Sequence, residues 1–209
     1  MASSREQPLA IESVPSYLVD DKTIREMAEV ARAGFSRPTD EDMSRDTREH
    51  VEDSHVVGIA RDNGRIVGTS MARVVDDHTF NWMGCIVHPD YQRRRLGQQF
   101  MALHRNTLNR RILVGHTRTP RILAVIRRES ERTCPIDRDP DLIEIALGME
   151  NVSYFGGIPY QLNRYYIAGL YGNDDPAEGS LDRGGPSLKK LFPGLRNPRS
   201  AVIVVARLA

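Results

Sequence analysis

The chain has 209 residues, of which 29 are Lys or Arg and 28 are Asp or Glu, and its formal net charge is +1. This length suits one domain with a sizeable core, and the near-neutral charge marks neither a general nucleic-acid binder nor a membrane binder. Cys85 and Cys134 lie far apart without a C-x-x-C pattern, which argues against a zinc site or a disulfide framework and favours a reducing compartment. The first ten residues have no signal-peptide core, and no run approaches the ~18 apolar residues of a membrane span. We therefore expect a cytoplasmic protein that contacts no membrane and holds no metal.

The first half of the chain predicts one strand, two helices and three further strands. Residues 20–35 carry apolar side chains at helical spacing behind an aspartate cap, and residues 37–53 predict a second, polar helix. Asn63-Gly64 indicates a tight hairpin, because a type I′ turn needs positive φ at both central residues. The expected strands cover residues 8–14, 55–61, 65–75 and 79–87.

The second half predicts a helix that opens near Gly97 and buries a stripe formed by Leu96, Phe100 and Leu103. Its other expected elements are a buried strand at 121–126, a helix within 139–155, and strands at 161–172 and 200–208. Residues 173–199 lie between the last two strands and are rich in glycine, proline and charge. They predict a long loop.

Charge is distributed unevenly along the chain. Residues 91–133 contain eleven arginines against Glu129 and Glu131, whereas residues 40–53 are mainly acidic. The basic stretch predicts either an anionic ligand or a solvated face. The acidic stretch mildly favours a cationic ligand, although a solvated helix face explains it equally well.

Residues 84–100, GCIVHPDYQRRRLGQQF, combine the end of a predicted strand, a basic turn and the start of a predicted helix. The unpaired N–H groups and the dipole at a helix start together favour an anion. Gly97 allows close approach of a ligand to the backbone, and the neighbouring arginines suit phosphate oxygens. The stretch therefore predicts a phosphate or pyrophosphate site.

The run from Val87 to Gly97, VHPDYQRRRLG, resembles the acyl-CoA motif of the GNAT acyltransferase superfamily: valine, any residue, proline, two residues, then Gln/Arg-x-x-Gly-x-Gly/Ala. Counting from the proline puts Gln92 first and Gly97 last, with Arg95 where the motif has its first glycine. A shifted frame that begins at Arg94 restores that glycine but puts Gln99 at the last small position. We prefer the first frame because its proline spacing holds.

The resemblance implies a single α/β domain over residues 1–209, with a mixed central sheet of about six to seven strands flanked by helices. It implies acetyl-CoA as co-substrate, with the backbone amides of Ile86 and Val87 at the thioester carbonyl, where they would stabilise developing charge. It also implies a set of residues around the pyrophosphate: Gln92, Arg93, Arg94, Arg95, Leu96, Gly97 and Gln98.

The family usually needs a base for the amine and an acid for the thiolate. The expected strand 79–87 has no carboxylate, so a water relay, a carboxylate from another segment or an already neutral amine would serve. By similarity to a Tyr-x-x-x-Gly-Phe pattern, Tyr154 is the first candidate acid and Tyr160 the second. The alternative for each is an aromatic residue of the core or of a pocket wall.

The resulting hypothesis is acetyl transfer from acetyl-CoA to a primary amine of a small molecule or a peptide. We expect direct attack in a ternary complex, because no cysteine or serine has a visible activating partner. Residues 173–199 would help to select the acceptor, and a homodimer stays open. Two alternatives remain: a non-catalytic acyl-CoA-binding module, and a basic RNA- or polyanion-binding protein, which the scarcity of aromatic residues in the basic stretch disfavours.

Overall fold

The structure is a computed structural model that describes residues 9–35, 41–149, 151–162 and 175–209. Its strands form one mixed sheet in the order β1-β2-β3-β4-β5-β9-β8-β7, and β6 also pairs with β9. The strands are β1 (Ala10–Pro15), β2 (Val56–Asp62), β3 (Arg65–Val74), β4 (Thr79–Val87), β5 (Ile112–Thr117), β6 (Ser130–Cys134), β7 (Val152–Phe155), β8 (Ile158–Leu162) and β9 (Ser200–Leu208). The predicted α/β class is confirmed, and among the described residues the sheet has nine strands where about six to seven were expected.

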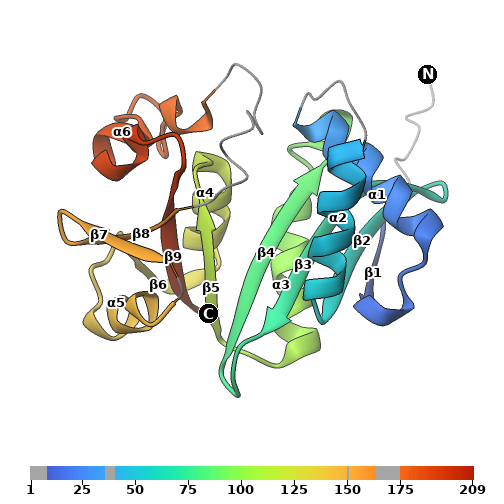
Figure 1. Ribbon diagram of the computed structural model, residues 1–209, viewed down its shortest axis with the longest axis horizontal. Coiled ribbons are helices and arrows are strands. Elements are labelled where there is room, and N and C mark those ends of the chain that lie inside the picture. Colours follow the sequence, from blue (N-terminus) through green and yellow to red (C-terminus); the bar gives the residue numbers. More distant parts are fainter. Residues whose placement is uncertain (1–8, 36–40, 150, 163–174) are drawn as a thin grey trace, which may run out of the picture.

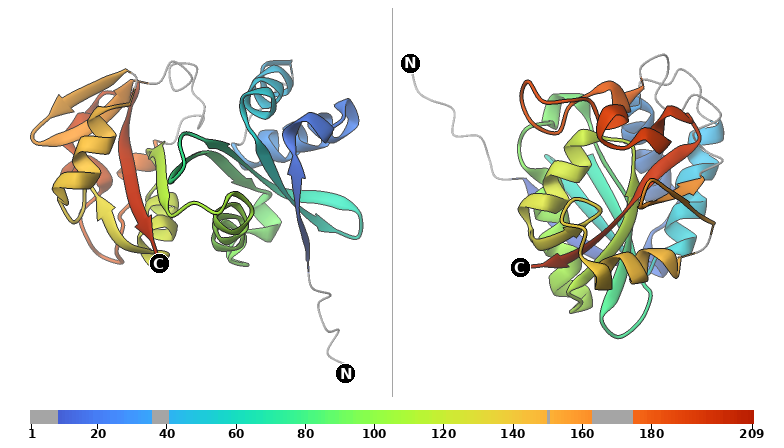
Figure 2. Two further views of the ribbon diagram at one scale, coloured as in Figure 1. Left: turned by 90° about the horizontal axis from the view of Figure 1, so that it is seen from below. Right: turned by 90° about the vertical axis from the view of Figure 1, so that its left-hand side faces the viewer.

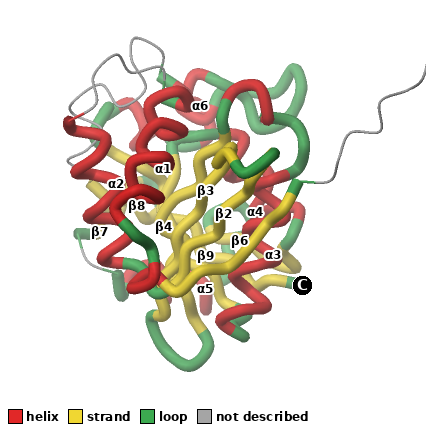
Figure 3. Tube along the Cα trace, turned by 90° about the vertical axis from the view of Figure 1, so that its right-hand side faces the viewer, coloured by secondary structure: helices red, strands yellow, loops and turns green. Residues whose placement is uncertain are grey.

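Helices cover both faces of this sheet. The α-helices are α1 (Asp21–Gly34), α2 (Glu41–Asp53), α3 (Leu96–Leu108), α4 (Pro120–Arg128), α5 (Pro140–Leu147) and α6 (Leu188–Leu191). Short 3-10 helices are η1 (Ser16–Leu18), η2 (Pro89–Tyr91), η4 (Pro176–Glu178) and η5 (Pro193–Arg196). In Figures 2 and 3, α1 and α2 lie on one face of β2–β4 and α3 lies on the opposite face. No helix among the described residues is long and apolar enough to span a membrane.

Local signals determine the elements of the first half. The carboxylate of Asp20 accepts a hydrogen bond from the Thr23 N–H at 2.7 Å, which caps α1. Asn63 and Gly64 have φ values of 49° and 83°, so the predicted type I′ hairpin between β2 and β3 is confirmed. The predicted strand 79–87 is β4 with the same bounds.

One predicted element of the second half is wrong. The expected strand 121–126 is helix α4, because Pro120 opens it and its buried residues, Leu123 and Ile126, recur at helical spacing. The strand between β4 and β9 in the sheet is β5, which pairs with β4 on one side and with β9 on the other.

The helix expected within 139–155 is confirmed as α5, and the last residues of that segment form the separate strand β7. In the turn between α5 and β7, Asn151 adopts a φ of 59°, which a helix cannot accommodate. The expected strand 161–172 overlaps β8 at its start, and its residues from 163 onward lie outside the described part. The last expected strand, 200–208, is confirmed as β9.

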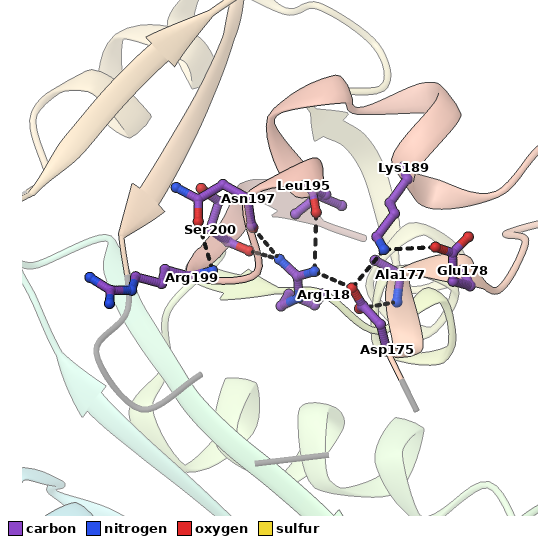
Figure 4. A network of polar contacts seen from close by, with 9 residues as sticks. All are labelled: Arg118, Asp175, Ala177, Glu178, Lys189, Leu195, Asn197, Arg199 and Ser200. Carbon is purple, nitrogen blue, oxygen red and sulfur yellow. Dashed lines mark hydrogen bonds and ion pairs between the residues drawn. The ribbon is translucent and has the colours of Figure 1, made fainter. Parts of the chain in front are cut away.

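The expected loop 173–199, described from residue 175, contains η4, α6 and η5 and is held by a buried arginine (Figure 4). Arg118, only 2% exposed, donates to the carbonyls of Leu195 (3.1 Å), Asn197 (2.9 Å) and Ser200. It also donates to the carboxylate of Asp175 at 2.7 Å. Arg118 therefore joins the end of β5 to the start of η4 and to the segment before β9.

Lysine joins the same network from α6. Lys189 lies 2.9 Å from the carboxylate of Asp175 and 2.7 Å from that of Glu178. Burial alone would raise the pKa of Asp175, but hydrogen bonds from Lys189, the Ala177 N–H and Arg118 lower it below its ordinary value. Asp175 is therefore an ionised carboxylate in the folded protein at neutral pH.

We expect Asp175→Asn to lower the free energy of unfolding by about 1.5–3 kcal/mol at pH 7, because Arg118 loses a charged partner. A carboxyl with a lowered folded pKa stabilises the fold above its unfolded pKa, and this stabilisation is lost as the pH falls through the folded value. The difference between wild type and variant should therefore shrink below about pH 4. Denaturant unfolding across that range measures it.

Glu178→Gln is the matched control. Its side chain is 66% exposed and bonds only to Lys189 in the described part, so we expect a loss of at most about 1 kcal/mol. Equal losses for the two variants would show that Arg118 does not depend on Asp175.

Candidate functional site

The two central strands β4 and β5 lie side by side over only three residue pairs. They pair in parallel at Thr79–Ile112, Phe80–Leu113 and Asn81–Val114, and no pairing continues beyond these. In Figure 1 the strands meet near their starts and diverge toward the top of the view. The later part of each strand therefore faces the other across an opening in the middle of the sheet.

A bulge lies on β4 where this opening begins. In the register with β3, Trp82 pairs with Ala72 and Gly84 pairs with Met71, so Met83 is an extra residue on β4. A bulge of this kind bends the strand and increases its twist. It sets the direction of the backbone groups that follow.

The backbone amides of β4 after the bulge alternate between β3 and the opening. The N–H of His88 donates to the carbonyl of Val67 at 2.9 Å, so it points toward β3. Because successive amides along a strand point to opposite sides, the amide of Ile86 also faces β3, whereas those of Cys85 and Val87 face the opening. Of the two predicted carbonyl-binding amides, only that of Val87 has the required direction.

The turn between β4 and α3 forms a concave set of backbone N–H groups. Arg93 and Arg95 have φ values of 70° and 61°, and Arg95 is the N-cap of α3. In the described part of the chain, the N–H groups of Arg93, Arg95, Leu96 and Gly97 donate no hydrogen bond. Successive amides in such a conformation make an anion-binding nest.

Arg95 stands where the motif has its first glycine, and its left-handed backbone explains why glycine suits that position. Gly97 stands at the last small position, and a Cβ there would meet Val125 Cγ2 at 3.6 Å. An added methyl group therefore fits, but a larger side chain would extend toward α4.

All the predicted site residues except Arg94 and Tyr154 line one cleft of about 1450 Å³, which extends from the nest along the opening between β4 and β5. Arg94 instead lies over the ring of Tyr91, at 4.9 Å. Arginines from two elements surround the nest end: Arg93, Arg95, Arg121 and Arg128. Arg121 donates to the side-chain carbonyl of Gln92 at 2.7 Å and so joins α4 to the turn.

The other end of the cleft is lined by α2 and by the end of β5. From α2 come Asp46, Glu49 and His50, and from β5 comes His116. Burial, followed by the nearby His50, lowers the pKa of His116 to about 4, so its imidazole is neutral at pH 7. Carboxylates absent from β4 thus reach the cleft from the acidic stretch.

Both cysteines are poor nucleophiles. Burial raises the pKa of Cys85 to about 12 despite a hydrogen bond with Ser70. Burial and the nearby Asp139 raise the pKa of Cys134 to about 12 as well. Each is a protonated thiol at neutral pH.

The two candidates for the acid, Tyr154 and Tyr160, do not line the cleft. Tyr154 lies on β7, is 56% exposed and lines no part of the cleft, and Tyr160 is buried with its hydroxyl accepting from the Gly194 N–H. Tyr91 lines the cleft, but its hydroxyl donates to Asp62 at 2.6 Å, which raises the pKa of the phenol. The tyrosines between residues 163 and 174 lie outside the described part of the chain.

Several arginines of the basic stretch bond to the fold itself. Arg105 donates to the carbonyl of Ala209, Arg110 to those of Asp76 and Leu108, and Arg118 is buried as described above. No group of three or more His, Cys, Asp or Glu suited to a metal occurs among the described residues.

Sequence reasoning missed three polar residues at the site: Thr69, Ser70 and His104. Thr69 is 1% exposed, lines the cleft, and its hydroxyl has no partner among the described residues. Ser70 and His104 are both fully buried and bond to each other at 3.0 Å. The sequence signal that could have found them is a polar residue at each of these positions, within a predicted face that is otherwise apolar.

The family model described as "Acetyltransferase (GNAT) family" matches residues 23–111. Among solved structures, the chain is similar to the IAA acetyltransferase of Bacillus cereus ATCC 14579, at 11% identity and a TM-score of 0.48, over 96% of this chain and 100% of that one. It is similar to the ribosomal-protein-S18-alanine N-acetyltransferase of Escherichia coli, at 12% identity and a TM-score of 0.49, over 97% of this chain and 95% of that one. It is also similar to a GNAT family acetyltransferase of Elizabethkingia anophelis with acetyl-CoA bound, at 10% identity and a TM-score of 0.47, over 97% of this chain and 99% of that one.

A search of curated proteins found no significant match. Because the three TM-scores are below 0.5, the assignment rests on the family model, whose matched segment contains β4, the nest and α3. That segment, fewer than half of the residues of the chain, is what is similar to the GNAT acetyltransferase family.

Proposed function

We propose that this chain transfers the acetyl group of acetyl-CoA to a primary amine of a small molecule or a peptide. One observation carries the proposal: an open strand edge and an anion-binding nest adjoin in a single cleft. The opening offers the amides of Cys85 and Val87, and the nest offers those that precede and begin α3. A long ligand with an amide-rich arm and a pyrophosphate would satisfy both.

The charges around the cleft support this orientation of the ligand. The nest end carries Arg93, Arg95, Arg121 and Arg128, which suit nucleotide phosphates. The Thr69 hydroxyl, buried without a partner in the described part, is a further group that a bound ligand would satisfy. The residues present therefore fit acetyl-CoA.

Acetyl-CoA supplies a thioester, whose C–S bond breaks as a C–N bond forms to the amine. In the proposed reaction the amide of Val87 hydrogen-bonds to the carbonyl oxygen, where charge develops. A protonated amine is no nucleophile, so a base has to take its proton. Asp46 and Glu49 line the acceptor end of the cleft and are the proposed source of that base.

We propose direct attack by the amine rather than an acyl-enzyme, because both cysteine thiols are held protonated by burial. Tyr154 remains the sequence-based candidate for the acid, although its exposed position on β7 gives it no contact with the cleft.

Calorimetric titration with acetyl-CoA, CoA and a short RNA, at low and moderate salt, tests the proposal. We expect saturable acetyl-CoA binding that survives added salt, followed by turnover in an amine screen. Acetyl-CoA binding without turnover of any amine would favour the non-catalytic module. Salt-sensitive RNA binding without CoA binding would overturn the proposal.

Enlarging Gly97 should weaken cofactor binding. We expect Gly97→Leu to raise the Kd for acetyl-CoA at least about tenfold, or about 1.4 kcal/mol, because the side chain enters the cleft beside the nest. Gly97→Ala is the control, since its methyl group makes only ordinary contacts with Val125. Unchanged affinity in Gly97→Leu, measured by calorimetry on a folded variant, would remove the nest from the binding site.

Replacing Arg95 by glycine should stabilise the fold. Its left-handed backbone costs about 1–2 kcal/mol for an L-residue, partly offset by the greater freedom of glycine in the unfolded chain. We expect Arg95→Gly to raise the free energy of unfolding by up to about 1 kcal/mol, whereas Arg94→Gly, at a position without positive φ, lowers it. Chemical denaturation measures both, and the reverse order would contradict the backbone assignment.

Removing the cleft carboxylates should affect turnover rather than cofactor binding. We expect Glu49→Gln to lower kcat/KM for the amine about 100-fold, with the Kd for acetyl-CoA unchanged. Asp46→Asn should also lower kcat/KM, because Asp46 lines the same end of the cleft. Steady-state rates over a range of pH measure this, and wild-type activity in both variants would place the base elsewhere.

A further inference from the structure

One serine hydroxyl forms hydrogen bonds with the residues on both sides of the β4 bulge. Ser70, on the neighbouring strand β3, is fully buried. Its hydroxyl donates to the carbonyl of Gly84 at 2.8 Å, and the indole N–H of Trp82 donates to that hydroxyl at 2.6 Å. Trp82 and Gly84 are the residues on either side of the extra residue Met83. One side chain thus spans the irregularity in the strand.

A histidine also forms a hydrogen bond with this hydroxyl. His104 Nε2, from the fully buried side chain of an α3 residue, lies 3.0 Å from Ser70 Oγ. A serine hydroxyl has one proton and two lone pairs. The proton goes to the Gly84 carbonyl and the oxygen accepts from Trp82, so the contact with His104 is a hydrogen bond when Nε2–H donates; the Cys85 thiol is a fourth partner of the same hydroxyl.

That assignment fixes the state of the imidazole. Nε2 carries the hydrogen, and Nδ1 is unprotonated and has no partner among the described residues. Burial lowers the pKa of His104 to about 4, in agreement with a neutral ring at pH 7. Ser70 is therefore fully hydrogen-bonded only while His104 keeps this tautomer.

The contact also connects two parts of the cleft. His104 lies two turns along the helix whose first residues form the nest, and Ser70 holds the bulge from which the amides of Cys85 and Val87 emerge. Apolar packing of Trp82 with Met101 also joins β4 to α3, and the hydrogen bond between Ser70 and His104 adds a directional contact at the bulge itself. A displacement of about 1 Å at a reacting group can cost about 100-fold in rate.

We propose that Ser70 and His104 are positioning residues for acyl transfer: together they hold the β4 bulge so that the Val87 amide points at the reacting carbonyl. This inference rests on the proposed function. The nest is shaped by the left-handed backbone of Arg93 and Arg95, which makes no contact with the pair in the described part of the chain. Loss of the pair should therefore lower kcat and leave the affinity for acetyl-CoA nearly unchanged.

The test compares three variants. We expect Ser70→Ala and His104→Leu to lower kcat about 10- to 100-fold, with less than about a threefold change in the Kd for acetyl-CoA. His104→Gln is the conservative control, because its amide N–H reaches about as far as Nε2–H and can donate to Ser70. It should keep most of the wild-type kcat.

Trp82 is the sole tryptophan in the sequence, so its fluorescence reports on the pair without any catalysis. Its emission should shift in Ser70→Ala, which removes the indole's acceptor, and stay close to wild type in His104→Gln. Rates are measured well below each variant's melting temperature, so that loss of folded protein does not imitate loss of positioning.

The outcomes separate the inference from the proposed function. Failure of the wild type to bind acetyl-CoA would overturn the function, whereas the fluorescence shift would still report the hydrogen bonds of Ser70. Wild-type kcat in Ser70→Ala and His104→Leu would overturn the positioning role. So would equal losses in His104→Leu and His104→Gln, or losses confined to the Kd.

Discussion

The parting of β4 and β5 after three residue pairs is the constraint on which the rest of the structure depends. A strand edge inside a protein carries N–H and C=O groups that need partners, and leaving them unpaired costs free energy. Here the sheet continues from β5 through β9 on one side and from β4 through β3 on the other, so the opening is a gap within the fold. A ligand with its own donors and acceptors can pair with that edge, and for this reason we propose the gap as a binding site.

The parts of this arrangement that could be predicted are those that rest on local signals. The Asn63-Gly64 hairpin, the capped helix α1 and the bounds of β4 follow from turn chemistry, capping and apolar runs a few residues long. The basic turn before α3 is local as well, because unpaired amides and positive φ arise within a handful of residues. Even Arg95, which departs from the resembled motif, occupies a backbone conformation that its neighbours impose.

The rest depends on contacts between distant residues. A short apolar run such as 121–126 suits a strand or a helix, and only packing against the sheet decides for α4. The bond between Ser70 and His104 joins residues 34 apart, and nothing near either residue indicates the other. The bulge at Met83 is likewise a property of the pairing between two strands. Tyr154 was placed by motif analogy, and the turn at Asn151 puts it on a strand remote from the cleft.

The arginines of the basic stretch shape the cleft in two different ways. Composition cannot distinguish Arg93, which lies exposed beside the nest, from Arg118, which is buried and bonded to three backbone carbonyls. Arg118 and Asp175 hold the segment that brings Asp175, Gly179 and neighbouring residues to the cleft. The nest instead depends on the conformation of its own backbone. The Arg118 network thus orders a segment that lines the cleft, whereas the left-handed backbone of Arg93 and Arg95 orders the nest.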